Sequence, residues 1–199
     1  MLDRARKSLL IFSHNHMKHW LRLEYADCNR FDTIDAGILQ VCRGTMSGHP
    51  APTEQSLTLD AVRPLPHAQA WKFNGLWNNS HAMAKRLGQT VPAEALYFVK
   101  ASNSYLPHDS ASKRPFGHEG KAVCEGEPGI VIGQTCGNID AVEAISGIFG
   151  YTCVNDVTAL ELLNRDASLV QWTPMRGGNV AQVTIDGIDG LRNRFEERT

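Results

Sequence analysis

The chain has 199 residues with 20 basic and 21 acidic side chains, so its formal net charge at neutral pH is −1. This balance and the lack of a Lys and Arg stripe argue against a nucleic-acid partner. No apolar run approaches the ~20 residues of a membrane span, so we expect no membrane partner. The length suits one domain with a sizeable core and a small N-terminal portion.

The cysteines are odd in number and show no C-x-x-C spacing; they are Cys28, Cys42, Cys124, Cys136 and Cys153. A disulfide framework or a zinc knuckle is therefore not expected, and a reducing compartment is favoured. The apolar run LLIF near the start is too short for the core of a secretory signal. We therefore expect a cytoplasmic protein.

The first 35 residues contain one candidate metal cluster. The stretch SHNHMKH holds His14, His16 and His19, whose spacing partly shares a helical face. No acidic partner lies nearby in the sequence, so an exposed polar segment is the preferred interpretation. The histidine cluster stays a minor alternative.

The next part of the chain consists of short strand-like pieces. Residues 37–44 (GILQVCRG) and 56–66 (SLTLDAVRPLP) flank residues 47–55 (SGHPAPTEQ), whose Gly and Pro predict a loop. We interpret residues 1–66 as a small N-terminal portion and residues 67–199 as the main domain.

A short helix is predicted to begin at His81, because Asn78, Asn79 and Ser80 before it are residues that cap helix N-termini. The run ALYFVK that follows is rich in β-forming residues and predicts a strand that ends at Lys100. Lys100 either faces a site or is solvated at the strand end, and both interpretations stay open.

Residues 122–156 hold the carboxylates whose spacing suggests chemistry. Glu125 and Glu127 are two residues apart, so on a strand both side chains point to one face. A divalent cation would relieve their repulsion, and oxygen ligands suit Mg²⁺, Ca²⁺ or Mn²⁺ better than zinc. From the spacing alone, a solvated strand face is the commoner explanation of such a pair.

A third carboxylate, Asp156, follows at the end of an apolar strand-like run. The connection from the glutamates predicts a strand at 129–133, a turn at 134–138, a helix at 140–149 and then this second strand. Such a unit returns Asp156 to the level of the glutamate pair.

The motifs CEGEPGIVIG, GYTCVNDVTALELLNRD and QWTPMR, in this order, resemble the successive signatures of the fumarylacetoacetate hydrolase family. The resemblance implies an α+β, predominantly β fold: a mixed β-sheet roll with short helices, whose C-terminal part is shortened here. It implies that Glu125, Glu127 and Asp156 bind Mg²⁺ or Mn²⁺. It also makes residues 67–199 the catalytic domain, and family members hydrolyse, decarboxylate, hydrate or isomerise small keto acids.

The chain departs from the family at the position expected to activate water. The segment around SHA matches a family motif in which the counterpart of His81 pairs with a glutamate three residues later, and here that position is Ala84. A histidine without an orienting carboxylate is a weaker general base. We keep His81 as the catalytic candidate, with His118 or Glu119 as alternative bases and Lys100 as a substrate-binding residue.

Substrate recognition also departs from the family. In relatives, Arg and Gln often lie four and seven residues after the aspartate, in a helix that follows it, and here these are Leu160 and Leu163. Apolar side chains cannot pair a carboxylate, so we expect a less acidic substrate with an apolar arm to contact them. Arg176 matches a family lysine and keeps its positive charge.

Several dozen residues of the family, including a loop that lines the active site, are missing at residues 176–179. Their loss would expose sheet edges and apolar faces, so we expect a homodimer.

The sequence therefore predicts a metal-dependent enzyme that acts on a small oxo or keto-enol compound through a metal-stabilised enolate. Carbon-carbon bond hydrolysis, decarboxylation, isomerisation and tautomerisation all stay open. Because Ala84 replaces the family glutamate, the reactions that do not need an activated, positioned water molecule are favoured. The alternative is a catalytically silent family member that acts as a binding or subunit-stabilising protein.

Overall fold

The structure is a computed structural model that describes residues 11–13, 18–48, 50–113, 120, 122–159, 180–186 and 189–196. The strands are β1 (Ile11–Ser13), β2 (His19–Tyr25), β3 (Cys28–Asp35), β4 (Ile38–Arg43), β5 (Ala51–Thr58), β6 (Arg63–Pro64), β7 (Phe73–Trp77), β8 (Leu96–Lys100), β9 (Ala111–Lys113), β10 (Ala122–Ile132), β11 (Ile148–Ala159), β12 (Val180–Ile185) and β13 (Asp189–Glu196). The helices are α1 (His81–Leu87) and α2 (Ala141–Ser146), with 3₁₀ turns at Met46–Gly48, Leu59–Ala61 and Ser102–Ser104.

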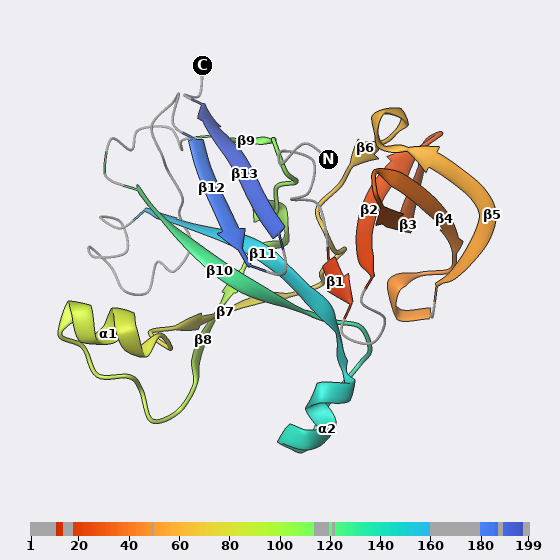
Figure 1. Ribbon diagram of the computed structural model, residues 1–199. Coiled ribbons are helices and arrows are strands. Elements are labelled where there is room, and N and C mark those ends of the chain that lie inside the picture. Colours follow the sequence, from red (N-terminus) through yellow and green to blue (C-terminus); the bar gives the residue numbers. More distant parts are fainter. Residues whose placement is uncertain are drawn as a thin grey trace.

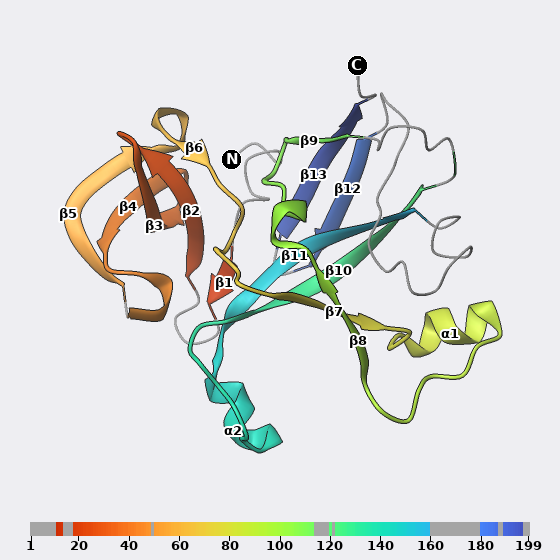
Figure 2. The same ribbon diagram turned by 180° about the vertical axis from the view of Figure 1, so that it is seen from behind.

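The largest sheet has eight strands in the order β10-β11-β1-β2-β3-β4-β5, and β6 pairs with β2. Figures 1 and 2 show that β2 to β5 curl together on one side of the molecule, while β10 and β11 form a long twisted ribbon across its middle. The short strand β1 is hydrogen-bonded to both β2 and β11 and so connects these two parts in one sheet.

Tight turns set the register of the N-terminal hairpins. Ala26 and Asp27 between β2 and β3 both have positive φ, as do Ala36 and Gly37 between β3 and β4. Two-residue turns with this backbone conformation match the right-handed twist of paired strands. The two turns therefore account for the close antiparallel pairing of β2, β3 and β4.

Three buried clusters fill the interior. The first lies in the curled N-terminal sheet and comprises Leu21, Leu23, Ile34, Leu39 and Leu59. The second contains Trp20, whose ring stacks on Phe31 at 5.0 Å and meets Phe149 edge-on at 5.7 Å. Because Phe149 belongs to β11, this aromatic contact packs the N-terminal strands against the central ribbon. The third cluster joins Cys153 of β11 to Val183 and Leu191 of β12 and β13.

The remaining strands form two smaller sheets. In the first, β13 pairs antiparallel with β12 and parallel with β9; in the second, β7 and β8 form a hairpin. The fold is thus predominantly β, with mixed strand pairing and short helices, as the sequence predicted. No helix in the described ranges is long and apolar enough to cross a membrane.

Three predicted element boundaries were wrong. The expected loop at 47–55 is shorter, because β5 begins at Ala51 and pairs with β4. The helix expected at 140–149 ends at Ser146, since Gly147 closes it and the next residues join β11. The expected helix after Asp156 does not begin there, because β11 continues to Ala159 against β10.

Several sequence predictions fall on residues outside the described ranges. These are His14, His16, His118, Glu119, Leu160, Leu163, Arg176 and the deletion expected at 176–179. The geometric reason given for Leu160 and Leu163, a helix running on from Asp156, no longer holds for residues 157–159. His19, the third member of the histidine cluster, lies in β2 and is half-buried.

Candidate functional site

The candidate carboxylates lie on one face of the β10–β11 ribbon. Glu125 is directly opposite Asp156 in the antiparallel register, and Glu127 is opposite Val154. Residues directly opposite one another share a face, as do residues two apart on a strand. The structure therefore brings Glu125, Glu127 and Asp156 to one side of the ribbon, from residues about 30 apart in the sequence.

Asp156 is buried, with only 5 % of its side chain exposed, and a lysine neutralises it. Lys100, at the end of β8, donates a hydrogen bond from Nζ to Oδ1 of Asp156. The Lys100 ammonium also lies 5.3 Å from the centroid of the Phe98 ring, within the range of a cation–π contact. Lys100 therefore faces the carboxylates and is not solvated at the strand end.

The electrostatics of the ribbon follow from burial and like charges. Desolvation by burial, together with the charges of Asp156 and Glu125, raises the pKa of Glu127 to about 7. Burial and Asp156 also raise the pKa of Glu125, while Lys100 opposes the shift in both glutamates. One ammonium group is thus shared among three carboxyl groups, which favours an additional cation or a bound proton.

The donor set of these three residues fits a hard divalent cation, because all donors are carboxylate oxygens. The side chains do not form a cage as they stand: within the described ranges, no three His, Cys, Asp or Glu side chains converge closely enough to hold a metal ion. The Lys100 ammonium contacts Oδ1 of Asp156, so a cation at this face would share the Asp156 carboxylate with Lys100.

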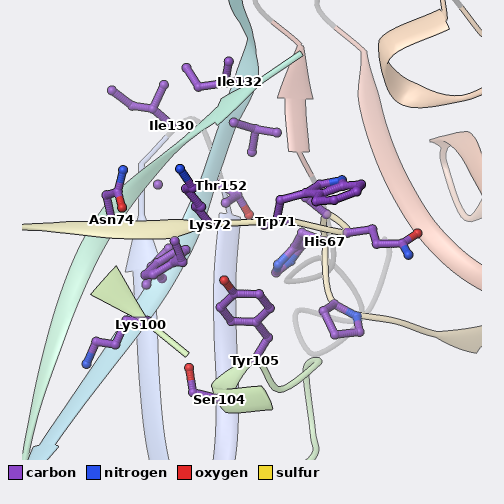
Figure 3. A pocket seen from close by; sticks show the side chains of 18 of the residues that line it. His67, Trp71, Lys72, Asn74, Lys100, Ser104, Tyr105, Ile130, Ile132 and Thr152 are labelled. Atoms are coloured by element: carbon purple, nitrogen blue, oxygen red, sulfur yellow. The ribbon is translucent and has the colours of Figure 1, made fainter. Parts of the chain in front are cut away.

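A cavity of about 1100 Å³ lies beside the ribbon. Lys100 and Asp156 line it, whereas Glu125 and Glu127 do not. Figure 3 shows Lys100 and Tyr105 on one side of the cavity, with Ile130 and Ile132 of β10 and Thr152 of β11 on the other. The ion pair is thus accessible to a small molecule in the cavity.

Comparison with known proteins places this site in a family. The family model described as fumarylacetoacetate (FAA) hydrolase C-terminal matches residues 72–194, more than half of the chain. The chain belongs to the fumarylacetoacetate hydrolase family. The match contains all three carboxylates, Lys100 and His81, and it confirms the resemblance on which the sequence prediction rested.

Individual relatives agree with this assignment. An uncharacterised protein of Archaeoglobus fulgidus is 36 % identical over 115 residues, which cover 58 % of this chain and 44 % of that protein. The mitochondrial oxaloacetate tautomerase of Arabidopsis thaliana is 34 % identical over 110 residues, 55 % of this chain and 49 % of that one. The chain spans about half the length of these curated relatives.

The fold has a counterpart among solved structures. The 2-hydroxyhepta-2,4-diene-1,7-dioate isomerase of Mycobacterium marinum superposes with a TM-score of 0.76 at 19 % identity, over 90 % of this chain and 98 % of that one. At this identity, the superposition supports the fold of the family and nothing finer.

The family's candidate general base is not in the cavity wall. His81 begins α1 as predicted, and Ser80 caps the helix by accepting a hydrogen bond from the Met83 amide. His81 is exposed, and Figures 1 and 2 both show α1 standing off from the β10–β11 ribbon. Ala84, where the family has glutamate, is buried and offers no polar group to the histidine.

The polar residues of the cavity wall that sequence reasoning missed include Tyr105, Thr152 and Asn155. Thr152 lies four residues before Asp156 on β11, so strand alternation was a usable signal for it. Asn155 contacts the Cys124 thiol, whose pKa is raised by burial.

Proposed function

We propose that the chain is an enzyme of keto–enol chemistry, which moves a proton between carbon and oxygen of a small 2-oxo acid. The observation that carries the proposal is the ion pair of Lys100 and Asp156 in the wall of the cavity, directly opposite Glu125. The activity named for the Arabidopsis thaliana relative, an oxaloacetate tautomerase, supports this reaction class. Hydrolysis and decarboxylation are competing outcomes of the test.

A divalent cation, Mg²⁺ or Mn²⁺, belongs to the proposal. Glu125, Glu127 and Asp156 would hold it, since their carboxylates share one face of the ribbon. A cation bound there supplies Lewis acidity, which polarises a carbonyl oxygen of the substrate. The raised pKa of Glu127 supports this assignment, because a carboxyl group that gains a nearby cation loses its proton readily.

Lys100 has two tasks in this proposal. In the free protein its ammonium group neutralises Asp156, and with substrate present it donates a hydrogen bond to the oxygen on which negative charge develops. Tautomerisation moves one proton from carbon to oxygen and consumes no water. The reaction therefore suits a site in which Ala84 replaces the glutamate that would orient a hydrolytic base.

The residue that removes the carbon-bound proton is proposed to be His81. Its exposure leaves the imidazole free to accept a proton, and α1 must approach the cavity for the transfer to occur. This step distinguishes an enzyme from the silent alternative, because a protein that only binds would need no such approach.

The test follows the ultraviolet absorbance of enol phenylpyruvate and of enol oxaloacetate as they convert to the keto form, with Mg²⁺ or Mn²⁺ present. We expect turnover of phenylpyruvate within the range of ordinary enzymes, about 1 to 10³ s⁻¹, and slower turnover of oxaloacetate. Asp156→Asn and Lys100→Met should each lose about 100-fold or more. Glu143→Gln, on exposed α2, is the control and should match the unaltered protein.

If both enol substrates convert at the uncatalysed rate with either metal, the tautomerase proposal is refuted. The catalytically silent family member is then the remaining interpretation. Release of CO₂ or of a cleaved acid from the same substrates would instead assign decarboxylation or hydrolysis. Calorimetric titration with Mg²⁺ tests the metal separately. The double variant Glu125→Gln, Glu127→Gln should not bind the ion, and equal binding by that variant would remove the glutamates from the site.

A further inference from the structure

Arg22 is a half-buried cation with no ion-pair partner in the ranges that the structure describes. It lies on β2, where Glu24 is the next residue on the same face. Glu24 does not neutralise it, because the Glu24 carboxylate is paired with Arg63. Burial lowers the pKa of the Arg22 guanidinium, a sign that its charge is held partly away from water.

Arg22 lines a pocket of about 360 Å³ with Gln69, Trp71, Ser102 and Tyr105, which we call the Arg22 pocket. The Tyr105 hydroxyl is buried and has no hydrogen-bond partner in the described part of the chain. A buried hydroxyl without a partner is destabilising. The pocket thus combines an unpaired positive charge with an unused donor, and one anionic group would satisfy both.

The Arg22 pocket adjoins the cavity that holds Lys100 and Asp156. The segment from Pro66 to Trp71 contributes to both walls, and so does Tyr105. Figure 3 shows Tyr105 between Lys100 and Trp71 in this shared wall. A single extended ligand can therefore occupy both spaces, with one end at the ion pair and the other at Arg22.

We propose that the Arg22 pocket is an anion-binding subsite for the terminal carboxylate of a linear keto acid. Arg22 supplies a charged fork that matches a carboxylate, and the Tyr105 hydroxyl donates a hydrogen bond. Trp71, which is 97 % exposed, covers the aliphatic arm between the two ends. The placement of the keto end at Lys100 rests on the proposed function, whereas the subsite itself does not.

This assignment gives the recognition of a substrate carboxylate to a different residue from those used in the family. The family's usual partners for a substrate carboxylate are replaced in the sequence by Leu160 and Leu163. Arg22 lies on β2 in the N-terminal sheet, which precedes the part of the chain that the family model matches. The subsite therefore extends the expected substrates from keto acids with an apolar arm to those that also carry a distant carboxylate.

The experiment titrates metal-free protein with straight-chain dicarboxylates from malonate to suberate, and with the monocarboxylate of each length, by calorimetry. We expect one chain length to bind about tenfold or more tightly than its monocarboxylate. Arg22→Gln should abolish this preference, and Arg22→Lys should retain part of it, because lysine keeps the charge and loses the fork. Arg86→Gln, an exposed arginine of α1, is the control.

The absence of any dicarboxylate preference, or an unchanged preference in Arg22→Gln, would overturn the subsite. Stronger binding of inorganic phosphate than of every dicarboxylate would overturn its assignment to a carboxylate. If circular dichroism shows that Arg22→Gln does not fold, the subsite is tested instead by the NMR resonance of the Arg22 Nε–H in the unaltered protein. It should shift with the preferred dicarboxylate and not with the monocarboxylate. None of these readouts needs turnover, so they stand apart from the tautomerase assay.

Discussion

Lys100 and Asp156 form an ion pair between residues that lie 56 positions apart in the sequence and on different sheets. The pair ties the end of β8, in the β7–β8 hairpin, to the middle of the β10–β11 ribbon. Both partners are largely buried, with 14 % and 5 % of their side chains exposed. A pair held this far from water makes each partner depend on the other, because either charge alone would be costly there.

Lys100→Met should therefore destabilise the metal-free protein by about 3 kcal/mol, since it leaves the buried Asp156 without a counter-charge. Urea unfolding at pH 7 in EDTA measures this loss. Added Mg²⁺ should raise the unfolding free energy of Lys100→Met more than that of the unaltered protein, because no ammonium competes for the carboxylate.

The control is Lys85→Met, which removes an exposed lysine of α1 and should change stability by no more than about 0.5 kcal/mol. If Lys100→Met and Lys85→Met unfold at the same urea concentration, the ion pair contributes nothing to the stability of the protein in solution.

The raised pKa of Glu127 predicts an unusual dependence of stability on pH. A carboxyl group whose pKa is about 7 in the folded protein and ordinarily 4.5 binds more protons when folded across that interval. The unfolding free energy of the metal-free protein should therefore fall as pH rises from 4.5 to 7, and this contribution is lost above 7. Urea unfolding across this range in EDTA measures the slope.

Glu127→Gln should flatten this slope and should be more stable than the unaltered protein above pH 7, because it removes a desolvated like charge. Glu143→Gln, on exposed α2, should keep the slope. The same pKa implies that Mg²⁺ binding at pH 7 releases protons, which calorimetry in two buffers of different ionisation enthalpy detects. A Mg²⁺ affinity that does not increase through pH 7 would contradict the assignment.

The sequence predicted the parts of the site that depend on local spacing. Strand alternation put Glu125 and Glu127 on one face, and the return of the chain after α2 put Asp156 opposite Glu125. Ser80 and the residues before it predicted where α1 begins. These features depend on neighbours in the sequence, so local rules were sufficient.

Long-range pairing accounts for what was missed. Residues 157–159 begin a run with helix-forming residues, yet they form strand because β10 is long enough to pair with them. The pairing of Lys100 with Asp156 depends on how the hairpin docks onto the ribbon. The strands β2 and β3 were also missed, although Leu21 and Leu23 alternate with polar residues on β2.

The protein is expected to form a homodimer. Within the described part of the chain, β10 lies at the edge of the large sheet and pairs only with β11. It carries Ile130 and Ile132, which are 60 % and 54 % exposed. A long edge strand with exposed apolar residues is an association surface that a second copy would cover. Sedimentation at micromolar concentration should give about twice the 22.0 kDa chain mass, and a concentration-independent 22 kDa species would contradict a dimer.

The close approach of Gly75 and Phe98 gives a test of how the hairpin positions Lys100. These residues are directly opposite each other on β7 and β8, and a Cβ added at Gly75 would overlap the Phe98 ring. Gly75→Ala must therefore displace the ring, at a cost of about 1 to 3 kcal/mol. Lys100 contacts the same ring, so the displacement should also weaken its pairing with Asp156.

Urea unfolding of Gly75→Ala measures the cost, and Gly137→Ala is the matched control because an added Cβ there meets no atom within 4 Å. A double variant separates the cost of displacing the Phe98 ring from the cost of weakening the Lys100–Asp156 ion pair. If the strain acts through Lys100, then Gly75→Ala should cost less in a Lys100→Met background than in the unaltered protein, because the pair is already lost. Equal costs in both backgrounds would mean that Phe98 moves without disturbing Lys100, and the hairpin would then have no part in positioning the lysine.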